Sequence, residues 1–326
     1  MATMESPALS RSSGGFPGPG LTRSVSWVIV GLTFAFLTNT YLSIWHGWPG
    51  ALRGGLGFVQ AGVYAAGVLA PILFVLRTDR SLRRDAQVLT GLVAYIVRTA
   101  FWAVVLIGLV DMAISFLRVE ALLGGLVGHD FATELGRSQF RGPYVHMPLL
   151  ALSLVIAART RTIGFHWLAL LVVVAELLIV ITRFVFSYEQ AFQGDLVRFW
   201  YAGLFLFASA YTLYEDGHVR VDVLYSGFRP KTRGAFNAFG SLVMGVSLCA
   251  VILAFGMWDK TSVITSPLLN YEVSQSGFGM YVKYLMAGFL GVFAVTMMIQ
   301  FAAYLMDSIA DYREEPGHRD TEAPMS

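Results

Sequence analysis

Residues 183–222, RFVFSYEQAFQGDLVRFWYAGLFLFASAYTLYEDGHVRVD, decide the fold class of this chain. A charged and aromatic turn opens the stretch, and an apolar run from Phe199 to Tyr214 follows without a charged side chain. The run ends in a cluster of titratable residues that alternate with valines. An uncharged run between two charged ends is typical of a membrane helix. We therefore interpret the stretch as a transmembrane span with polar turns on both sides.

The composition extends this interpretation to the whole chain. The 326 residues are 56% hydrophobic and 13% charged, whereas soluble domains carry about 25% charged residues. The apolar residues gather in runs of about 20, the length that crosses a hydrocarbon core. Hydropathy predicts spans at 24–45, 56–76, 87–117, 142–158, 163–186, 196–214, 235–257 and 280–306. The sequence thus predicts an all-α integral membrane protein of about eight transmembrane helices.

The charged residues of the connections predict the orientation. Lys and Arg concentrate in one set of connections, for example at Arg77, Arg80, Arg83 and Arg84 after the second span. The positive-inside rule then predicts that both termini face the cytoplasm. The net charge of +2 gives no sign of a nucleic-acid partner. The single cysteine, Cys249, excludes a disulfide or a cysteine-based metal site within one chain.

Four regions are expected along the chain. Residues 1–23 are polar and rich in Gly, Pro and Ser, so we expect a disordered tail. Residues 24–162 form a membrane extension of four helices, and 163–313 form a second membrane domain of four helices. Residues 314–326 form a cytoplasmic tail.

The long connections carry further expectations. On the outer side, residues 118–141 mix apolar and polar side chains, which favours a short helix at the membrane interface. Residues 258–279 form the second long outer loop. On the cytoplasmic side, 223–234 has basic and aromatic residues around Pro230 and suits an elbow at headgroup level.

Two ionisable residues fall inside predicted spans. Arg98 lies in the third span and Glu176 in the fifth. Counted from the cytoplasmic end at about 1.5 Å per residue, the two side chains reach similar depths. We therefore predict an intramembrane ion pair. It either fixes helix packing or takes part in ion coupling.

A second group of charges lies near the outer face. By the same count, Asp111, Arg183, Asp195 and Arg198 reach similar heights. They are expected to form an outer charge collar that closes the ends of spans three, five and six. The alternative is a set of solvated side chains with no mutual contacts.

The cluster after the sixth span is the third candidate. His218, Arg220 and Asp222 alternate with Val219 and Val221, which suggests an extended segment with one polar face. We expect these three side chains to cap the turn and hold the cytoplasmic elbow. A plain solvated loop is the competing interpretation.

Catalytic and cofactor sites are not expected. The sequence has neither the P-loop pattern GxxxxGK[ST] nor GxSxG, which argues against an ATP-driven pump and a common class of hydrolase. A haem between His46 and His146 in a redox membrane anchor is one alternative. An autonomous carrier or channel lined by Arg98, Asp111 and Glu176 is another.

Several spaced elements between residues 163 and 313 resemble one known family, the small permease (Q) subunit of tripartite ATP-independent periplasmic (TRAP) transporters. The elements that carry the resemblance are Arg183-Phe-Val-Phe, His218-Val-Arg-Val-Asp222, Arg229-Pro-Lys-Thr-Arg233, Glu272-Val-Ser-Gln-Ser276, Lys283 and Gln300-Phe301. The long N-terminal half resembles the mannitol and chloroaromatic-compound branch of that family.

The resemblance implies a function and partners. It implies a multi-pass protein of the bacterial inner membrane that scaffolds a large permease (M) subunit. That subunit would import an organic anion by sodium symport, and a periplasmic binding protein would deliver the anion. The small subunit itself carries neither substrate nor sodium and is not an enzyme. It contacts membrane lipid and the large subunit, and we expect no cofactor.

The outer loop 258–279 is the expected docking surface for the binding protein. It lies in the half of the chain that carries the resemblance, and its candidate residues are Asp259, Lys260, Tyr271 and Glu272. Charged contacts of this kind mainly tune the rate of encounter and its salt dependence.

Overall fold

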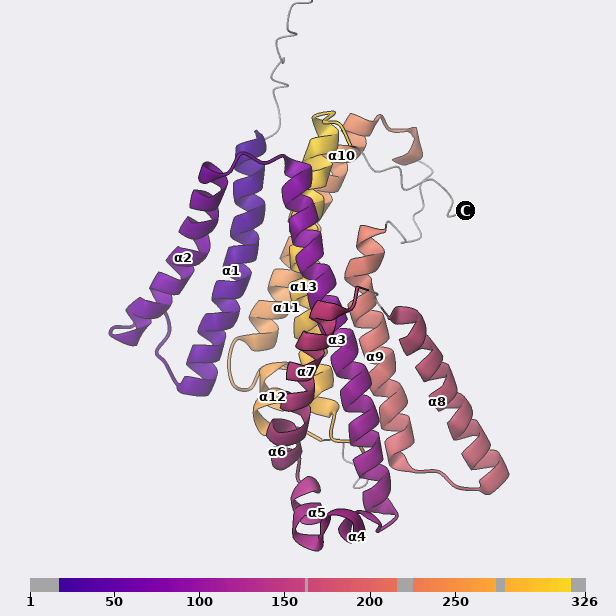
Figure 1. Cartoon of the computed structure of the whole chain (residues 1–326). Helices are drawn as coiled ribbons and strands as arrows, with labels where there is room; N and C mark the ends of the chain where they lie inside the picture. Colours follow the sequence, from indigo (N-terminus) through magenta and orange to yellow (C-terminus); the bar gives the residue numbers. More distant parts are fainter. Residues whose placement is uncertain (1–17, 162–163, 216–224, 274–278, 318–326) are drawn as a thin grey trace, which may run out of the picture.

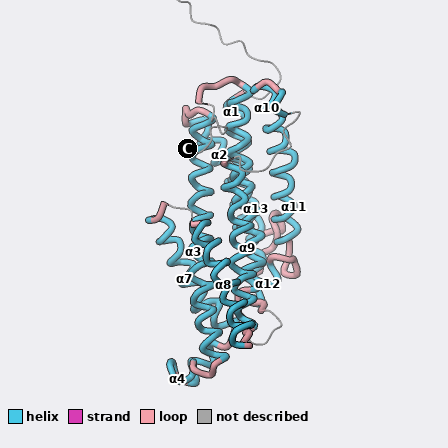
Figure 2. Tube along the Cα trace, turned by 90° about the vertical axis from the view of Figure 1, so that its right-hand side faces the viewer, coloured by secondary structure: helices cyan, strands magenta, loops and turns pink. Residues whose placement is uncertain are grey.

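The computed structural model describes residues 18–161, 164–215, 225–273 and 279–317. Within these residues the chain is helical, with connecting loops and no strand (Figure 2). They contain eight helical runs that are long and apolar enough to cross a membrane. These runs are α1 (Pro19–His46), α2 (Leu56–Arg77), α3 (Leu82–Val119), α6–η1–α7 (Ser138–Arg159), α8 (Phe165–Phe186), α9 (Ala191–Tyr214), α10–η3–α11 (Pro230–Met257) and α13 (Lys283–Tyr312). The predicted all-α membrane fold is confirmed.

The connections hold short helices. The predicted helix in the loop 118–141 is present as three pieces, α4 (Leu123–Val127), α5 (His129–Leu135) and α6 (Ser138–Arg141). The second long loop contains α12 (Thr265–Asn270), and a short turn of 3-10 helix, η2 (Tyr225–Gly227), precedes α10 (Pro230–Phe239).

Two of the spans change winding along their length. The π-helical segment η1 (Gly142–His146) joins α6 to α7 (Met147–Arg159), and η3 (Gly240–Val246) joins α10 to α11 (Ser247–Met257). A π-helical turn places side chains at angles that a regular α-helix does not reach, and such turns are frequent at functional sites.

Local sequence signals explain where the spans begin and end. The Ser81 hydroxyl accepts a hydrogen bond from the backbone N–H of Arg84 and caps α3. Pro19 and Pro230 occupy first turns, where the missing N–H costs nothing. Gly47 ends α1 with φ at +67°, a conformation that favours glycine.

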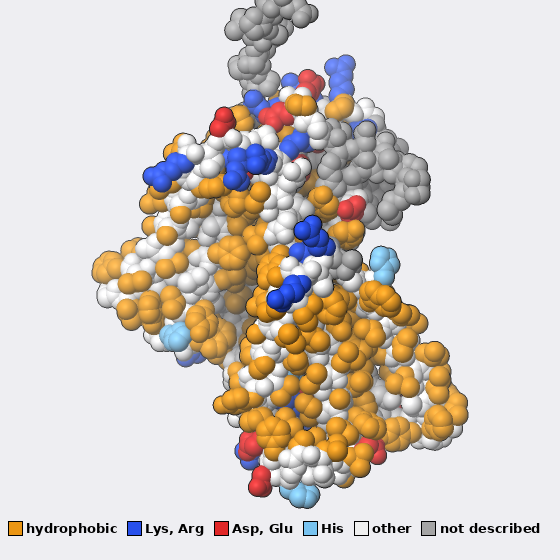
Figure 3. Space-filling view, in the orientation of Figure 1, with side chains coloured by type: hydrophobic (Ala, Val, Ile, Leu, Met, Phe, Trp, Pro, Cys, Tyr) orange, Lys and Arg blue, Asp and Glu red, His pale blue; other side chains and the backbone are white. Residues whose placement is uncertain are grey.

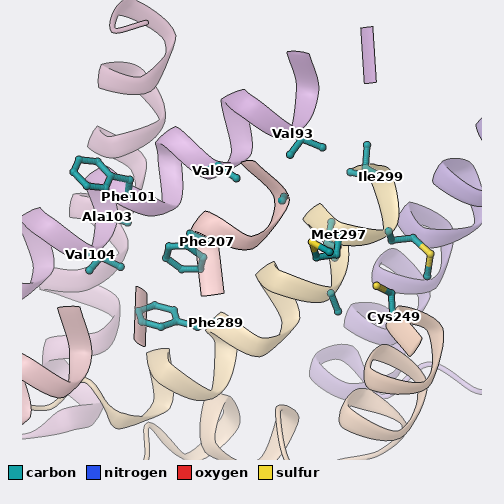
Figure 4. Packing of buried hydrophobic residues seen from close by; sticks show 14 of the residues in the cluster. Val93, Val97, Phe101, Ala103, Val104, Phe207, Cys249, Phe289, Met297 and Ile299 are labelled. Carbon is teal, nitrogen blue, oxygen red and sulfur yellow. The ribbon is translucent and has the colours of Figure 1, made fainter. Parts of the chain in front are cut away.

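The core of the molecule lies along α13 and α3. The ring centroid of Phe289 on α13 lies 4.9 Å from that of Phe207 on α9 (Figure 4). It lies 5.1 Å from the ring centroid of Phe199, also on α9. α13 also packs against α1, α3, α10 and α11. Because α3 packs on α9 and α13, the N-terminal spans share this core with the C-terminal ones.

The α1–α2 hairpin stands at one edge of the bundle (Figure 1). A Cβ added to Gly31 would lie 2.2 Å from the carbonyl oxygen of Gly67. Only small residues allow two membrane helices to approach so closely. Both glycines are therefore needed for this helix crossing.

The connecting turns lie at more than two levels (Figure 1). We call the end with the α2–α3 turn, the start of α10 and the described chain ends the basic end, and the end with α4 and α5 the loop end. The end of α7 and the start of α8 do not reach the basic end but lie midway along α3. There the Trp102 indole donates to the hydroxyl of Thr160, the residue that follows α7.

Candidate functional site: a buried polar joint

The most developed polar cluster of the structure joins α3 to the α6–η1 segment and to the start of α13. We call this cluster the polar joint. Its side chains are Asp111 and Ser115 on α3, Arg141 at the end of α6, His146 in η1, and Tyr281 and Tyr284 beside the start of α13. Asp111, Arg141 and His146 are all 0% exposed. Charges in such a position are rare and need partners.

The carboxylate of Asp111 lies at the centre of the joint. Its Oδ1 accepts a hydrogen bond of 2.7 Å from Nη1 of Arg141 and lies 3.1 Å from Nε2 of His146. Its Oδ2 accepts the backbone N–H of Tyr281 at 2.8 Å. Three donors on one carboxylate compensate for the lost hydration of the charge.

His146 links this carboxylate to α13. Its Nδ1 lies 2.7 Å from the hydroxyl of Tyr284. A neutral imidazole with its proton on Nε2 satisfies both contacts, since Nε2–H donates to Asp111 and Nδ1 accepts from the phenol. The π-helical turn η1 carries His146 and thereby aims it at α3 and α13 together.

Arg141 completes the joint from the other side. Its Nε donates to the carbonyl of Leu135 at 2.7 Å, and its Nη1 also contacts the Ser115 hydroxyl at 3.1 Å. Its guanidinium carbon lies 4.2 Å from the centre of the Tyr281 ring, a cation–π contact. Nη2 is buried, and no described residue accepts a hydrogen bond from it.

The chemistry of the joint is that of a structural connection. Its acid, base and cation are all engaged with one another, so none is presented to a reacting molecule. Among the described residues, no group of three or more His, Cys, Asp or Glu side chains has the arrangement of a metal site. Both ring nitrogens of His146 are occupied, so the haem pairing with His46, which is itself exposed, does not fit this geometry.

A second set of ion pairs lies at the basic end. Asp85 is fully buried, and its Oδ2 accepts from Nε of Arg23 at 2.8 Å and from the Trp27 indole at 3.0 Å. Arg83 pairs with Asp311 of α13 at 2.8 Å. These contacts join α1 to α3 and α3 to α13. Hydropathy alone does not show that Arg83 lies beside Asp311.

The predicted pair between Arg98 and Glu176 is not formed. Arg98 is half-buried and its Nε lies 3.4 Å from the carbonyl of Ala157, at the end of α7. Glu176 is exposed in the middle of α8. No ion pair joins the two among the described contacts. The prediction assumed that spans three and five begin at one level, whereas α8 begins beside Phe101, whose ring lies 6.4 Å from that of Phe165.

The predicted outer collar is divided in the structure. Asp111 belongs to the polar joint. Asp195 lies 3.8 Å from the exposed Arg198 on the same helix, and its Oδ2 accepts the backbone N–H of Met280 at 3.0 Å. Arg183 pairs with Glu189 in an exposed turn at 3.5 Å. Equal height along the chain did not bring these four residues together.

The remaining candidates lie in loops. His218, Arg220 and Asp222 fall outside the described residues. Asp259 and Lys260 are exposed, and hydrogen bonds from Thr261 hold the pKa of Asp259 below its usual value.

The other two loop candidates are engaged within the chain. The ring of Tyr271 packs against that of Tyr284, with 5.3 Å between centroids. Glu272 forms an ion pair with Lys283.

Comparison with known proteins finds a family model that matches part of the chain. Residues 168–310 match the family model described as "Tripartite ATP-independent periplasmic transporters, DctQ component". No curated protein and no solved structure matches the chain. The matched residues begin in α8 and end in α13, and they include the Tyr281 and Tyr284 side of the polar joint. The segment from α8 to α13 is thus similar to the DctQ component of TRAP transporters.

Proposed function

We propose that the chain is the small membrane subunit of a TRAP-type transporter in the bacterial inner membrane, with both termini in the cytoplasm. In this function it scaffolds a large permease subunit, which imports an organic anion by sodium symport. A periplasmic binding protein delivers the anion. The observation that carries the proposal is the family match over residues 168–310, which spans the four C-terminal membrane helices.

A scaffold needs a surface for its partner, and α8 offers one. Its buried side chains, Leu168, Val172 and Ala175, lie on one stripe, and its neighbours are chiefly α9 and the nearby part of α3. The rest of the helix exposes large apolar side chains, including Trp167 at 70% and Phe184 at 78% (Figure 3). The large permease subunit would cover this face.

Glu176 would make this face of α8 selective for a partner helix of matching polarity. It is an exposed carboxyl in the middle of an apolar span, where an unpaired charge is costly. A partner helix with a cation or a hydrogen-bond donor at that depth would satisfy it. The permease helix that covers α8 is therefore expected to carry such a group.

The polar joint supports a scaffold over an autonomous carrier. Carriers bind substrate at discontinuous helices near the midplane. The buried charges of Asp111 and Arg141 are instead bonded to each other and to neighbouring helices. Such bonding holds helices in place and leaves no described charge free for an anion in the joint.

Two finer assignments belong to the same proposal. Asp259 and Lys260 provide the exposed charges for docking of the binding protein, with Tyr271 and Glu272 shaping the loop behind them. The N-terminal spans would be the extension found in long small subunits of the mannitol and chloroaromatic-compound type.

Co-expression with a large permease and binding protein from the same operon tests the proposal. We expect the tagged chain to retain the permease in detergent and to be required for uptake of an organic anion. Leu177→Asn on α8 should weaken retention, whereas the matched change Leu69→Asn on α2 should not, since these leucines are similarly exposed at 55% and 58%. A permease that is neither retained nor dependent on the chain for uptake would refute the assignment.

A further inference from the structure

The central helix α3 is too long for a single upright crossing. It has 38 residues, which is about 57 Å of α-helix. The hydrocarbon core of a bilayer is about 30 Å thick. The helices packed on α3 show how its length is used.

One group of helices starts where α3 starts. The Arg23–Asp85 pair fixes the beginning of α1 beside the first turn of α3. The Arg83–Asp311 pair places the end of α13 at the same level. Gly234 of α10 lies against the backbone of the last turns of α13, so α10 begins there too.

A second group starts far along α3. Trp102 contacts Thr160 at the α7–α8 turn, and Phe101 packs against Phe165 at the start of α8. At its other end α8 reaches the C-cap of α3, where Tyr188 donates to Glu120. The α7–α8 turn thus lies about 17 residues, or roughly 25 Å of helix, beyond Asp85.

Both levels carry the marks of a membrane surface. The α2–α3 turn has Arg77 and Arg80, and the α7–α8 turn has Arg159 and Arg161. Exposed apolar side chains cover α2 beside the first level and α8 beside the second. In Figure 3 the apolar surface correspondingly descends from one lobe to the other, with basic atoms above each lobe.

We infer that the bilayer crosses this bundle obliquely, so that the α2–α3 turn and the α7–α8 turn lie at the same membrane surface. An upright bundle would place either the apolar flank of α8 or that of α2 in water, at a large cost in exposed apolar area. Tilting removes both exposures, and tilts of 0–40° are normal for membrane helices. The inference concerns the depth of the spans in the membrane and holds whether lipid or a membrane-embedded partner covers α8.

The oblique crossing also explains how the charged side chain of Arg98 is accommodated within the long apolar helix α3. It lies one helical turn from Trp102 and donates to the last turn of α7, so it is close to the α7–α8 turn. In the tilted bundle it reaches the headgroup region, where arginine side chains are stable.

Spin labels on the full-length protein in lipid vesicles test the inference. In a Cys249→Ala background, single labels replace the exposed Asp79 in the α2–α3 turn or the exposed Arg161 in the α7–α8 turn. Oxygen and nickel-chelate accessibility gives the depth of each label. We expect both labels at the headgroup level, within about one helical turn, 5.4 Å, of each other. A depth difference near 25 Å would overturn the inference.

A second measurement separates tilt from a deformed bilayer. Matched labels at Arg53 and Glu189 report the opposite surface and should likewise agree in depth. Polarised infrared dichroism of the amide band in oriented bilayers reports the mean helix tilt, which we expect to exceed the usual average of about 20°. Upright helices would contradict the oblique crossing even if all four labels lay at a surface, because the bilayer would then have bent to meet the bundle.

Discussion

Two of the polar links between α3 and its neighbours toward α13 differ in burial. The polar joint holds Asp111 and Arg141 with no exposed side-chain area. The pair of Arg83 with Asp311 at the basic end has the same N–O chemistry, but its side chains are 14% and 19% exposed. Burial sets the cost of breaking each link, because water can take the place of a lost partner only where it has access.

The two links also differ in how they contribute to the stability and packing of the bundle. Arg83 contacts the carbonyls of Glu315 and Pro316 as well, near the described end of the chain, where salt and water screen it. Asp111 instead accepts from three donors on two stretches distant from it in sequence, the α6–η1 segment and the residues before α13. The joint therefore specifies a single packing of α3, η1 and α13, and the basic-end pair adds to a packing that apolar contacts already stabilise.

The largest effect is expected from breaking the joint at its cation. Arg141→Met should lower the free energy of unfolding by about 3–5 kcal/mol, because the carboxylate of Asp111 then stays buried without its main partner. Equilibrium unfolding in mixed micelles measures this loss in the free energy of unfolding.

The control for this prediction is the double variant Asp111→Leu with Arg141→Met. Removing both charges leaves no uncompensated ion, so the double variant should regain much of the loss. If the double variant is as unstable as the sum of the single variants, the joint is not a coupled unit.

A smaller effect is expected at the hydroxyl of Tyr284. Tyr284→Phe keeps the ring and removes the donor to His146, which leaves one buried imidazole nitrogen unpaired. The expected loss is about 1–3 kcal/mol in the free energy of unfolding. Tyr271→Phe is the matched control, since that ring packs on Tyr284 from the neighbouring loop. Equal losses in both variants would show a general effect of removing a tyrosine hydroxyl here, and not the loss of the hydrogen bond to His146.

A still smaller and salt-dependent effect is expected at the basic end. Arg83→Gln should cost at most about 1 kcal/mol at low salt, because its pairs are partly exposed and screened. Unfolding in 0.05 M and 1 M salt measures the screening. An Arg83 effect that matches the Arg141 effect, or that ignores salt, would remove the distinction between the two links.

Hydropathy predicted the spans well because membrane length and apolar content are local properties of the sequence. The predicted span 87–117 falls within α3, and 142–158 falls within the run Ser138–Arg159. Capping residues such as Ser81 refine the ends in the same local way. The position of each helix along the bundle axis is not a local property, because it depends on packing between segments far apart in the chain.

The candidate site was predicted only in part for that reason. Asp111 was identified as an ionisable residue near a helix end, but its partners were not. Arg141 and His146 reach it because the loop 118–141 folds back and η1 turns His146 inward. The Arg98–Glu176 prediction failed because it gave every span the same starting level. A charge in a long apolar span next to a basic turn is a sequence signal that could have indicated two levels.

The smallest effect concerns a contact between two exposed side chains. In the turn between α8 and α9, outside the spans, the Tyr188 hydroxyl donates to the carboxylate of Glu120, and this bond raises the pKa of Tyr188 to about 12. A folded-state pKa above the ordinary value of 10.0 favours the neutral phenol. Its contribution to stability is thus fully present below pH 10 and is lost as the pH rises through about 12.

The alkaline ultraviolet difference spectrum measures this titration. Subtracting the spectrum of Tyr188→Phe from that of the unmodified protein should leave one phenolate that appears near pH 12. In a Glu120→Gln variant the same phenolate should appear at lower pH, because the negative acceptor is gone. A Tyr188 titration near pH 10 in both proteins would show that exposed contacts of this chain are not maintained in solution. The comparison would then be between buried polar contacts that persist in solution and an exposed contact that does not.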